Sequence, residues 1–235
     1  MDSLYKGIIK RKKDQVEFPI IVRRLTSNDL SSILQVQKKV LESLEKKDIL
    51  QPLTKAEFQY ILDGNGFMIG AFIGPELISF RALLVPPIDE EHLGLDVGLP
   101  ETELPKVIYQ EISNVLPEYR GNQLQKKLAR LIMVELEKEN HHYRYICCTV
   151  APFNIPSLKD KFSQGMQIRA LNDKHGGLLR YVFFLDLTET EPKKYNEIIP
   201  VKMGETAAQQ EKLSAGFRGL KMEKKQNDLW VYYGR

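Results

Sequence analysis

The stretch VLPEYRGNQLQKKLARLIM, from Val115 to Met133, constrains the fold more than any other part of the sequence. It contains the end of an apolar strand, a proline that frees the chain from further pairing, and a turn that enters a helix with one apolar face. The first amides of a helix lack intrahelical partners and lie at the positive end of its dipole, so such a turn accepts phosphate oxygens well. Arg120, Lys126 and Lys127 add positive charge. The segment therefore predicts an anion-binding turn, with a solvated basic helix start as the alternative.

Length and composition indicate an ordinary globular protein. The chain has 235 residues, enough for one well-buried domain with an appendage, and its 43% hydrophobic and 28% charged residues argue against disorder or a coiled coil. The net charge of +3 produces no domain-wide positive field, which argues against nucleic acid as a partner. No apolar run approaches the ~20 residues of a membrane span, and no signal-peptide pattern follows the basic N-terminal run. We therefore expect a cytoplasmic protein without a membrane partner.

Apolar periodicity predicts the elements on either side of this segment. Strands are expected at residues 20–25, 67–73, 77–84, 107–116, 143–150, 178–187 and 198–202, followed by a final hairpin. Helices are expected to begin at Ser27 or Asn28, near Thr54, after Gly121, near Ser157 and near Glu205. Residues 85–106 contain four prolines and six carboxylates and are expected to form a long loop.

The order of these elements predicts the fold class. Early hairpins and a central strand–helix–strand unit favour an α/β (α+β) fold with a mixed sheet. The tail after Pro192 is expected to form a small strand–helix–hairpin extension. We expect a basic N-terminal segment at residues 1–17, a main domain at residues 18–190, and an extension at residues 191–235 that packs on the main domain.

The cysteines and histidines predict no metal site. Cys147 and Cys148 are the only cysteines, and as neighbours in a strand they point to opposite faces, so we expect reduced, structural thiols. His141 and His142 lie together in an expected turn between a helix and a strand. Neither residue type has the spacing of a ligand set, so no metal is expected.

The run SNVLPEYRGNQLQKKL, which begins at Ser113, resembles the acetyl-CoA-binding motif of the GNAT superfamily of N-acetyltransferases. Members of that family show a strand, Pro-x-Tyr-Arg-Gly, and then Gly-x-Gly or Gly-x-Ala at the helix start. Asn154, Ser157, Gly165 and Met166 fall at the spacing of a second family motif. The resemblance implies a mixed, mostly antiparallel central sheet flanked by helices.

The same resemblance implies how a CoA thioester binds. The strand backbone would hold the pantetheine arm at Ser113, Asn114 and Val115, and the pyrophosphate would meet the turn and the helix start. The implied cofactor-binding residues there are Arg120, Gly121, Asn122, Gln123, Leu124, Gln125 and Lys126, with Asn154 as a further contact. Pairing with the arm would place the thioester for attack by an amine, and a strand amide would stabilise the oxyanion.

Some positions depart from the family pattern. Gln123 stands where the family prefers glycine, and Gln125 stands where it prefers glycine or alanine. Where the backbone approaches the ligand closely, a side chain obstructs the pyrophosphate. Lys161 occupies the position of a tyrosine that protonates the leaving thiolate, and Thr149 that of a glutamate base. Glu111 is the candidate catalytic base. The alternatives are that the proton passes through water, or that the carboxylate of Glu111 only faces solvent.

Three functions are compatible with these residues. The leading hypothesis is an N-acetyltransferase that moves the acetyl group of acetyl-CoA to a primary amine on a small molecule, a peptide N-terminus or a lysine. The second is a catalytically weakened domain that binds CoA or another ligand. The third is an interaction module whose tail forms a partner surface, and a homodimer is compatible with the sequence. The acidic residues of the loop at 85–106 either attract a cationic amine or merely stay solvated.

Overall fold

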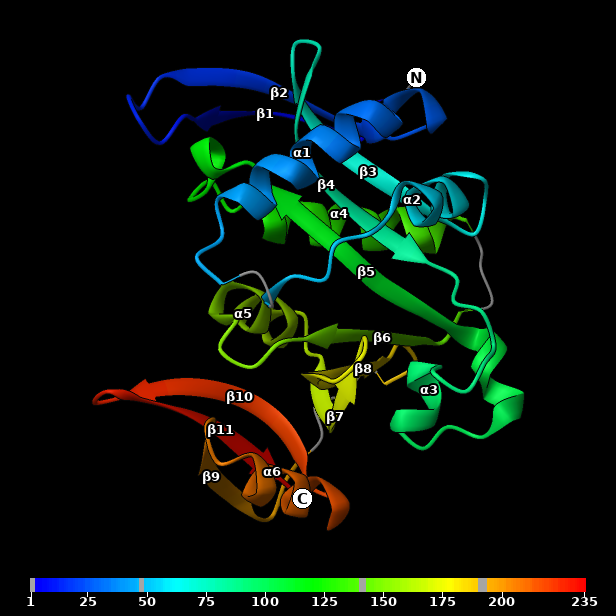
Figure 1. Ribbon diagram of the computed structural model, residues 1–235, viewed down its shortest axis with the longest axis vertical. Coiled ribbons are helices and arrows are strands. Elements are labelled where there is room, and N and C mark those ends of the chain that lie inside the picture. Colours follow the sequence, from blue (N-terminus) through cyan, green and yellow to red (C-terminus); the bar gives the residue numbers. More distant parts are fainter. Residues whose placement is uncertain (1–2, 47–48, 140–142, 190–193) are drawn as a thin grey trace. The chain divides into compact units, whose positions relative to one another are not determined.

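The computed structural model describes residues 3–46, 49–139, 143–189 and 194–235 (Figure 1). The chain forms two compact units: the first comprises residues 1–86 and 109–142, and the second comprises residues 87–108 and 143–235. The expected turn at His141 and His142 lies outside the described residues. The boundaries expected at residues 17/18 and 190/191 stay predictions.

The sheet of the first unit has the strand order β1–β2–β3–β4–β5, with antiparallel neighbours (Figure 1). Its strands are β1 (Tyr5–Lys10), β2 (Glu17–Arg24), β3 (Gly66–Ile73), β4 (Glu76–Leu84) and β5 (Val107–Val115), the last belonging to this unit from Tyr109 onward. The predicted hairpin of β3 and β4 is confirmed, and Gly74 at its turn has a φ of +53° that favours glycine. Strand β1 was not predicted.

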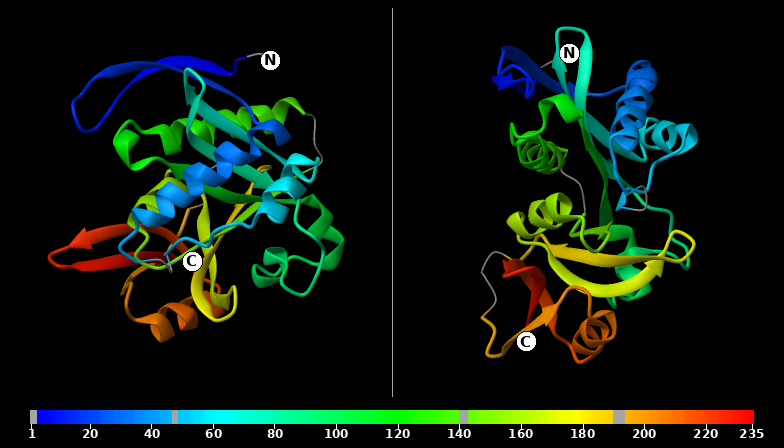
Figure 2. Two further views of the ribbon diagram at one scale, coloured as in Figure 1. Left: turned by 45° about the horizontal axis from the view of Figure 1, so that its top comes forward. Right: turned by 60° about the vertical axis from the view of Figure 1, so that its left-hand side comes forward.

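Helices cover both faces of this sheet. Helices α1 (Leu30–Glu42) and α2 (Lys55–Leu62) lie on one face, and α4 (Leu124–Lys138) lies on the other (Figure 2). Helix α2 begins near Thr54 as predicted, and Thr54 caps it: its hydroxyl accepts a hydrogen bond from the amide of Glu57 at 3.2 Å. The buried rings of Phe58 and Phe80 meet edge to face, 5.7 Å between centroids, and join α2 to β4.

The second unit contributes the remaining strands and three further α-helices of the described part of the chain. Its strand order is β6–β8–β7–β10–β11–β9, and the helices are α3, α5 and α6. The elements are α3 (Leu93–Asp96), β6 (Tyr145–Val150), α5 (Ile155–Ser163), β7 (Gln167–Lys174), β8 (Leu178–Asp186), β9 (Ile198–Lys202), α6 (Thr206–Ser214), β10 (Arg218–Lys225) and β11 (Asp228–Gly234). The predicted elements of the C-terminal extension are therefore confirmed, whereas β7 was missed.

The segment at residues 85–106 is more ordered than the long loop that we expected. It contains α3 and a 3₁₀ helix at Glu101–Lys106. Leu93 and Leu104 are 6% and 2% exposed, so burial of these side chains holds the short helices in place.

The cysteines match their predicted role. In the ladder between β6 and β8, Cys147 pairs with Phe184 and Cys148 with Phe183. Both thiols are free and buried, and burial raises the pKa of Cys147, which keeps this thiol protonated and unreactive.

The arrangement confirms the expected fold class. Within the units, mostly antiparallel strands are flanked by helices in a mixed α/β fold. No helix in the described part of the chain is long and apolar enough to cross a membrane.

Candidate functional site

Strand β5 carries a β-bulge at Glu111. In the ladder with β4, Ile112 pairs with Ala82 whereas Gln110 pairs with Leu83, so Glu111 is the extra residue. A bulge bends its strand and re-aims the local side chains, and bulges are common beside active sites. Glu111, the carboxylate predicted to be catalytic, therefore lies at a bulge in the strand that leads to the predicted site. This residue is partly buried.

Two polar atoms of β5 are buried without a partner just beyond the bulge. Ser113 Oγ and Asn114 Nδ2 make no hydrogen bond to the described residues. The neighbouring backbone is satisfied, because the carbonyl of Asn114 accepts a hydrogen bond from Ser79 Oγ at 2.8 Å. An unpaired buried polar group costs about 1–3 kcal/mol, and because neighbouring side chains of a strand point to opposite faces, these two atoms lie on different sides of β5.

The turn after β5 has two residues in the left-handed region of backbone space. A short 3₁₀ helix at Pro117–Tyr119 leads to Gly121 with φ +94° and to Gln123 with φ 56° and ψ 23°. Burial raises the pKa of Tyr119, which stays neutral beneath the turn. The backbone at Gln123 thus has the conformation that favours glycine, and a non-glycine residue there costs about 1–2 kcal/mol.

The backbone amides of residues 121–126 form a run of unpaired donors, here called the amide run. Within the described part of the chain, none of them donates a hydrogen bond, and the first helical bond of α4 joins Lys127 N to Gln123 O at 2.9 Å. These amides lie at the positive end of α4. The amide run can therefore bind the oxygens of a phosphate or pyrophosphate group, as the sequence predicted for this turn.

The N-terminal hairpin holds the turn in place through Asn122. Asn122 Oδ1 accepts a hydrogen bond from Lys10 N at 2.8 Å, and Asn122 Nδ2 donates to Lys10 O at 2.7 Å and to Tyr119 O at 2.9 Å. Lys12 N also donates to Glu118 O at 2.7 Å. The side chain of Asn122 is therefore committed to positioning the turn, and its backbone amide is the part that remains for a ligand.

The cationic side chains predicted around the turn differ in whether they are already engaged by other residues. Arg120 donates from Nη2 to Ser43 Oγ at 2.9 Å, which directs its guanidinium toward the end of α1. Lys126 is exposed and forms no ion pair with a described residue. Lys126 is thus free to neutralise an anion at the amide run, whereas Arg120 is already engaged.

Arg81 is a residue of the site region that the sequence analysis missed. It lies on β4 beneath α4 and is 1% exposed. Its guanidinium donates to Gln110 Oε1 at 2.6 Å and to the carbonyl of Gln125 at 3.4 Å. A cation under the first turn of α4 adds to the positive potential of the amide run. The signal in the sequence is one arginine within the apolar strand LISFRALL.

The remaining predicted residues lie in the second unit. Asn154 caps α5, because its Oδ1 accepts a hydrogen bond from Ser157 N at 3.4 Å. Lys161, which stands at the position of the family's tyrosine, is 7% exposed and lies 3.8 Å from the carboxylate of Asp160. The contact predicted between Asn154 and a CoA arm stays a prediction.

No group of three or more potential metal ligands is found among the described residues. The site offers backbone amides, a carboxylate at the bulge and nearby cations.

Comparison with known proteins supports the fold. No protein-family model matches the sequence. No curated protein is significantly similar to it in sequence. Many solved structures are similar in three dimensions.

Three of these structures align with this chain over nearly their whole length. An N-acetyltransferase from Staphylococcus aureus Mu50 has a TM-score of 0.53 and 15% identity, and the match covers 72% of this chain and 99% of that one. The GNAT domain of S. lividans PAT has a TM-score of 0.54 and 18% identity, covering 80% and 99%. Arabidopsis thaliana NAA60, solved in complex with acetyl-CoA, has a TM-score of 0.54 and 15% identity, covering 72% and 98%. The resemblance stated from the motifs is thereby confirmed for the fold: the chain has the fold of the GNAT N-acetyltransferases.

Proposed function

We propose that the chain is an N-acetyltransferase that moves the acetyl group of acetyl-CoA to a primary amine. The observation that carries the proposal is the amide run at the start of α4, which follows a bulged strand with unpaired buried polar atoms. CoA carries a pyrophosphate that needs several donors, followed by an arm with two amide groups that suits a strand edge. The enzyme is proposed to act in the cytoplasm, without metal, nucleic acid or membrane.

The backbone around Gly121 supports the fit of a pyrophosphate. A Cβ built on Gly121 would have no other described atom within 4 Å, so the space beside this backbone is open to a ligand. Gln123 is the residue that restricts the approach, because its side chain starts from a left-handed backbone next to the free amides. Lys126 supplies the nearest unengaged cation, and its charge strengthens phosphate binding.

The predicted residues of strand β5 have these roles in the proposal. The backbone of Ser113, Asn114 and Val115 holds the pantetheine arm and places the thioester beside the bulge. Glu111 accepts a proton from the attacking amine, and a strand amide stabilises the charge that develops on the carbonyl oxygen. The acetyl-CoA complex of the similarly folded NAA60 supports a CoA thioester as the acyl donor.

The second candidate is a domain that binds CoA without turnover. It is favoured by Lys161, which stands where many members of the family place a tyrosine and lies next to Asp160 in α5. A lysine can donate a proton, but it lacks the phenol of the family's acid.

A turnover assay separates the two candidates. The protein is mixed with acetyl-CoA and with amines of different classes, and the release of free CoA thiol is followed. The acetyltransferase proposal predicts amine-dependent thiol release, which falls about a hundredfold or more in Glu111→Gln, the size expected for loss of a general base. Glu137→Gln, at an exposed position of α4, is the matched control and should not change the rate.

The outcomes are distinct. Binding of acetyl-CoA without thiol release, for any amine class, would support the non-catalytic domain. Full activity in Glu111→Gln would remove this residue from the mechanism and leave proton transfer to water.

A further inference from the structure

Two arginines of the second unit, here called the arginine pair, face each other where strands β7 and β10 meet. Gly219 of β10 pairs with Ile168 of β7 in an antiparallel ladder, so Arg218 stands opposite Arg169. The strands approach closely there, because a Cβ built on Gly219 would lie 2.8 Å from the Cβ of Ile168. Like charges directly opposite each other in a sheet are destabilising, so the arginine pair costs stability unless an anion accompanies it.

A β-bulge directs the side chain of Arg169. In the ladder with β8, the pairing shifts between Ile168 and Ala170, so Arg169 is the extra residue, and a bulge re-aims the side chain that it carries. The guanidinium carbon lies 4.9 Å from the centroid of the Phe184 ring. Its Nη2 donates to Val97 O at 3.2 Å, and no other described residue accepts a hydrogen bond from it. The guanidinium is therefore oriented by its surroundings while most of its N–H groups remain for a ligand.

The charge of the arginine pair is not neutralised by the described residues. Arg218 Nη1 donates to the neutral carbonyl of Phe217 at 3.0 Å, and neither arginine forms an ion pair in the described part of the chain. Burial lowers the pKa of both guanidiniums, and the charge of Arg218 lowers the pKa of Arg169 further. Glu189 raises the pKa of Arg169, but its effect is smaller than that of Arg218. Because arginine stays protonated, two positive charges lie together in a partly buried place.

Tyr195 adds a hydroxyl beside the arginine pair. It influences the pKa of both Arg169 and Arg218 electrostatically, so it lies near both. Its oxygen accepts a hydrogen bond from Gln167 Nε2 at 2.7 Å, and no described residue accepts the hydroxyl proton. A hydroxyl can accept and donate at once, so this one is available as a donor. The two guanidiniums and the hydroxyl together form a group of donors without an acceptor.

We propose that the arginine pair and Tyr195 bind a phosphate group, either as inorganic phosphate or as the phosphomonoester of a small molecule. A phosphate dianion balances the two positive charges. A carboxylate has two oxygens, which a single guanidinium fork already occupies, whereas phosphate has enough oxygens for two forks. Bound phosphate joins β7 to β10 and stabilises the contact between them. The site is independent of the proposed function.

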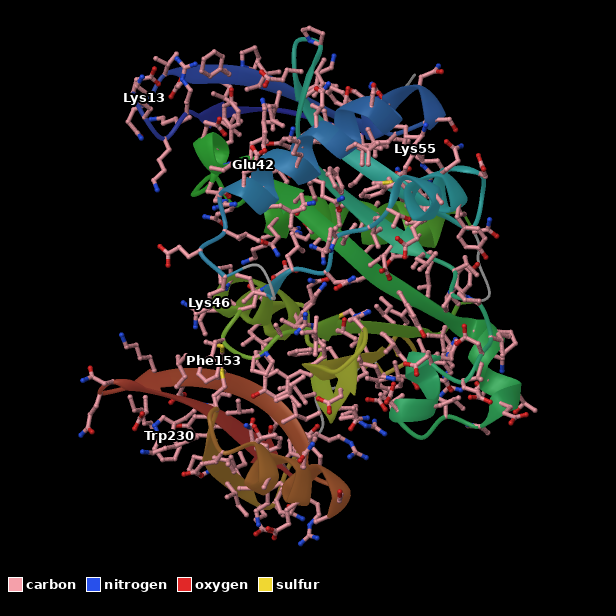
Figure 3. The ribbon with its side chains drawn as sticks, viewed as in Figure 1. Lys13, Glu42, Lys46, Lys55, Phe153 and Trp230 are labelled. Carbon is pink, nitrogen blue, oxygen red and sulfur yellow. The ribbon has the colours of Figure 1, made fainter. Side chains whose placement is uncertain are left out.

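Thermal unfolding of the full chain in phosphate and in chloride, at equal ionic strength, tests the site. The unfolding midpoint of wild type should rise with phosphate concentration, because a ligand that binds the folded state stabilises it. Arg218→Gln should shift this dependence to about tenfold higher concentration, the effect of losing a charge-assisted hydrogen bond. The hairpin of β10 and β11, which carries Trp230 (Figure 3), has an exposed lysine near its turn, and Lys224→Gln should leave the dependence unchanged. A wild type that does not respond to phosphate, or equal shifts in both variants, would overturn the proposal.

Stability in chloride alone separates a binding role from a structural one. Without phosphate, Arg218→Gln should be at least as stable as wild type, because it loses the repulsion from Arg169. A variant that is less stable in chloride and responds to phosphate as wild type does would show that Arg218 only packs. Tyr195→Phe keeps the ring and removes the hydroxyl, so it should weaken the response to phosphate without abolishing it. An unchanged response in Tyr195→Phe would remove this residue from the site.

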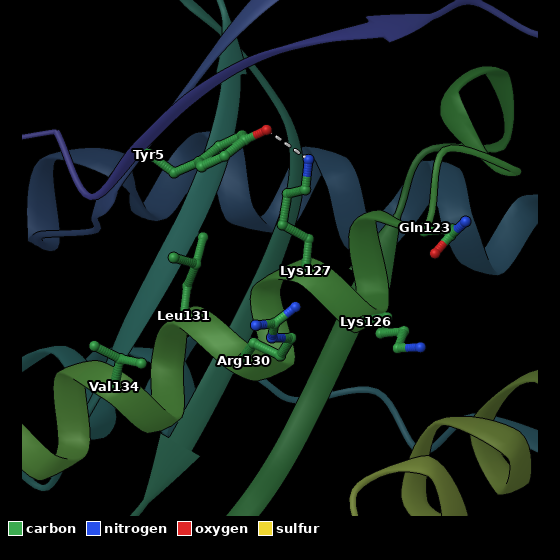
Figure 4. Close-up of a pocket in the computed structure, with 7 residues that line it drawn as sticks. All are labelled: Tyr5, Gln123, Lys126, Lys127, Arg130, Leu131 and Val134. Carbon is green, nitrogen blue, oxygen red and sulfur yellow. Dashed lines mark hydrogen bonds between the residues drawn. The ribbon is translucent and has the colours of Figure 1, made fainter.

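Phosphate can also bind at the amide run of α4, where Gln123 and Lys126 lie (Figure 4). Gln125→Glu places a negative charge there and separates the two locations. The response to phosphate should persist in Gln125→Glu and be weakened in Arg218→Gln. If Gln125→Glu abolishes the response and Arg218→Gln preserves it, the ion binds at the amide run and the proposal is wrong. The outcome for the arginine pair does not depend on whether CoA binds.

Calorimetric titration with different anions identifies the ligand. Tighter binding of phenyl phosphate than of inorganic phosphate, with both weakened by Arg218→Gln, would indicate the phosphomonoester of a small molecule. The reverse order would indicate free phosphate. Acetate should bind far more weakly than either, because it has one charge and two oxygens. Equal binding of acetate and phosphate would contradict the assignment of a phosphate site.

Discussion

The side-chain amide of Asn122 forms a pair of hydrogen bonds with the backbone of Lys10, accepting from its N–H at 2.8 Å and donating to its carbonyl at 2.7 Å. This pair joins residues that are 112 positions apart in the sequence. Because the same side chain also bonds to Tyr119 O, it connects strand β1 to both sides of the turn before α4. The N-terminal hairpin is therefore part of the structure that arranges the amide run.

Asn122→Ala should weaken binding of CoA about tenfold and lower the free energy of unfolding by about 1–3 kcal/mol, because the lost bonds leave the turn and Lys10 unsatisfied. The measurements are calorimetric titration with CoA and urea unfolding. Asn65→Ala, which removes one side-chain bond to Tyr60 O in the same unit, is the matched control and should lower stability without changing affinity. Equal affinities in Asn122→Ala and wild type would show that the hairpin does not position the amides.

Gln123→Gly should raise both the free energy of unfolding and the affinity for CoA. Glycine removes about 1 kcal/mol of left-handed backbone strain, and loss of the side chain opens the approach to the amide run. Gln226, in the turn between β10 and β11, has φ 54° and is an exposed glutamine in the same conformation. Gln226→Gly should therefore raise stability alone. A gain in affinity from both variants, or from neither, would contradict an obstruction at Gln123.

Gln209→Leu should lower the free energy of unfolding by about 3 kcal/mol, measured by urea titration. Gln209 is fully buried in the second unit, and its Oε1 accepts from the hydroxyls of Tyr181 at 2.6 Å and Tyr233 at 2.9 Å. Its Nε2 donates to Met203 O at 2.8 Å. Truncation leaves these partners buried and unpaired. Adding Tyr181→Phe and Tyr233→Phe should recover part of the loss, and failure to recover any of it would mean that packing, not hydrogen bonding, is the cause.

The ion pair of Arg23 and Asp29 should make stability depend on pH in the acid range. Hydrogen bonds from Arg23, at 2.7 and 2.9 Å, lower the pKa of Asp29 below its usual value, despite the opposing effect of burial. A carboxyl whose pKa is lower in the folded state stabilises the protein above the unfolded pKa of about 3.9, and this contribution is lost as the pH falls. The stability difference between wild type and Asp29→Asn should thus be constant from pH 5 upward and shrink below about pH 4.

Urea unfolding at a series of pH values measures this difference. Arg23→Gln removes the cause of the lowered pKa and should flatten the pH dependence in the same range. A difference that grows as the pH falls would have the wrong sign for this pair.

Elements with strong local signals could be predicted from the sequence. The β3–β4 hairpin and the start of α2 near Thr54 were found because turn residues and helix-start residues act on their immediate neighbours. Strand β1 was missed because its sequence, YKGIIK, does not alternate regularly between polar and apolar residues. Its two adjacent isoleucines lie on opposite faces, with Ile9 3% exposed and Ile8 64% exposed. Its conformation comes from pairing with β2, which is a tertiary effect.

The same distinction applies to the candidate site. The turn and the helix start were predicted because they are consecutive in the chain and their chemistry follows from the free amides of any helix. The hydrogen bonds of Asn122 and the position of Arg81 beneath α4 depend on distant partners, which a single sequence does not identify. The bulge at Glu111 has no signal of its own, because it depends on the register between β4 and β5.

The central claim is that the amide run binds the pyrophosphate of acetyl-CoA, and one calorimetric experiment tests it most directly. Gln125→Glu places a carboxylate at the second residue of α4, where it suits the helix dipole but repels a phosphate. Gln35→Glu adds the same charge at an exposed position of α1. We predict that wild type and Gln35→Glu bind acetyl-CoA equally well, and that Gln125→Glu binds about tenfold more weakly. Equal affinity in all three proteins, or no binding to wild type, would contradict the claim.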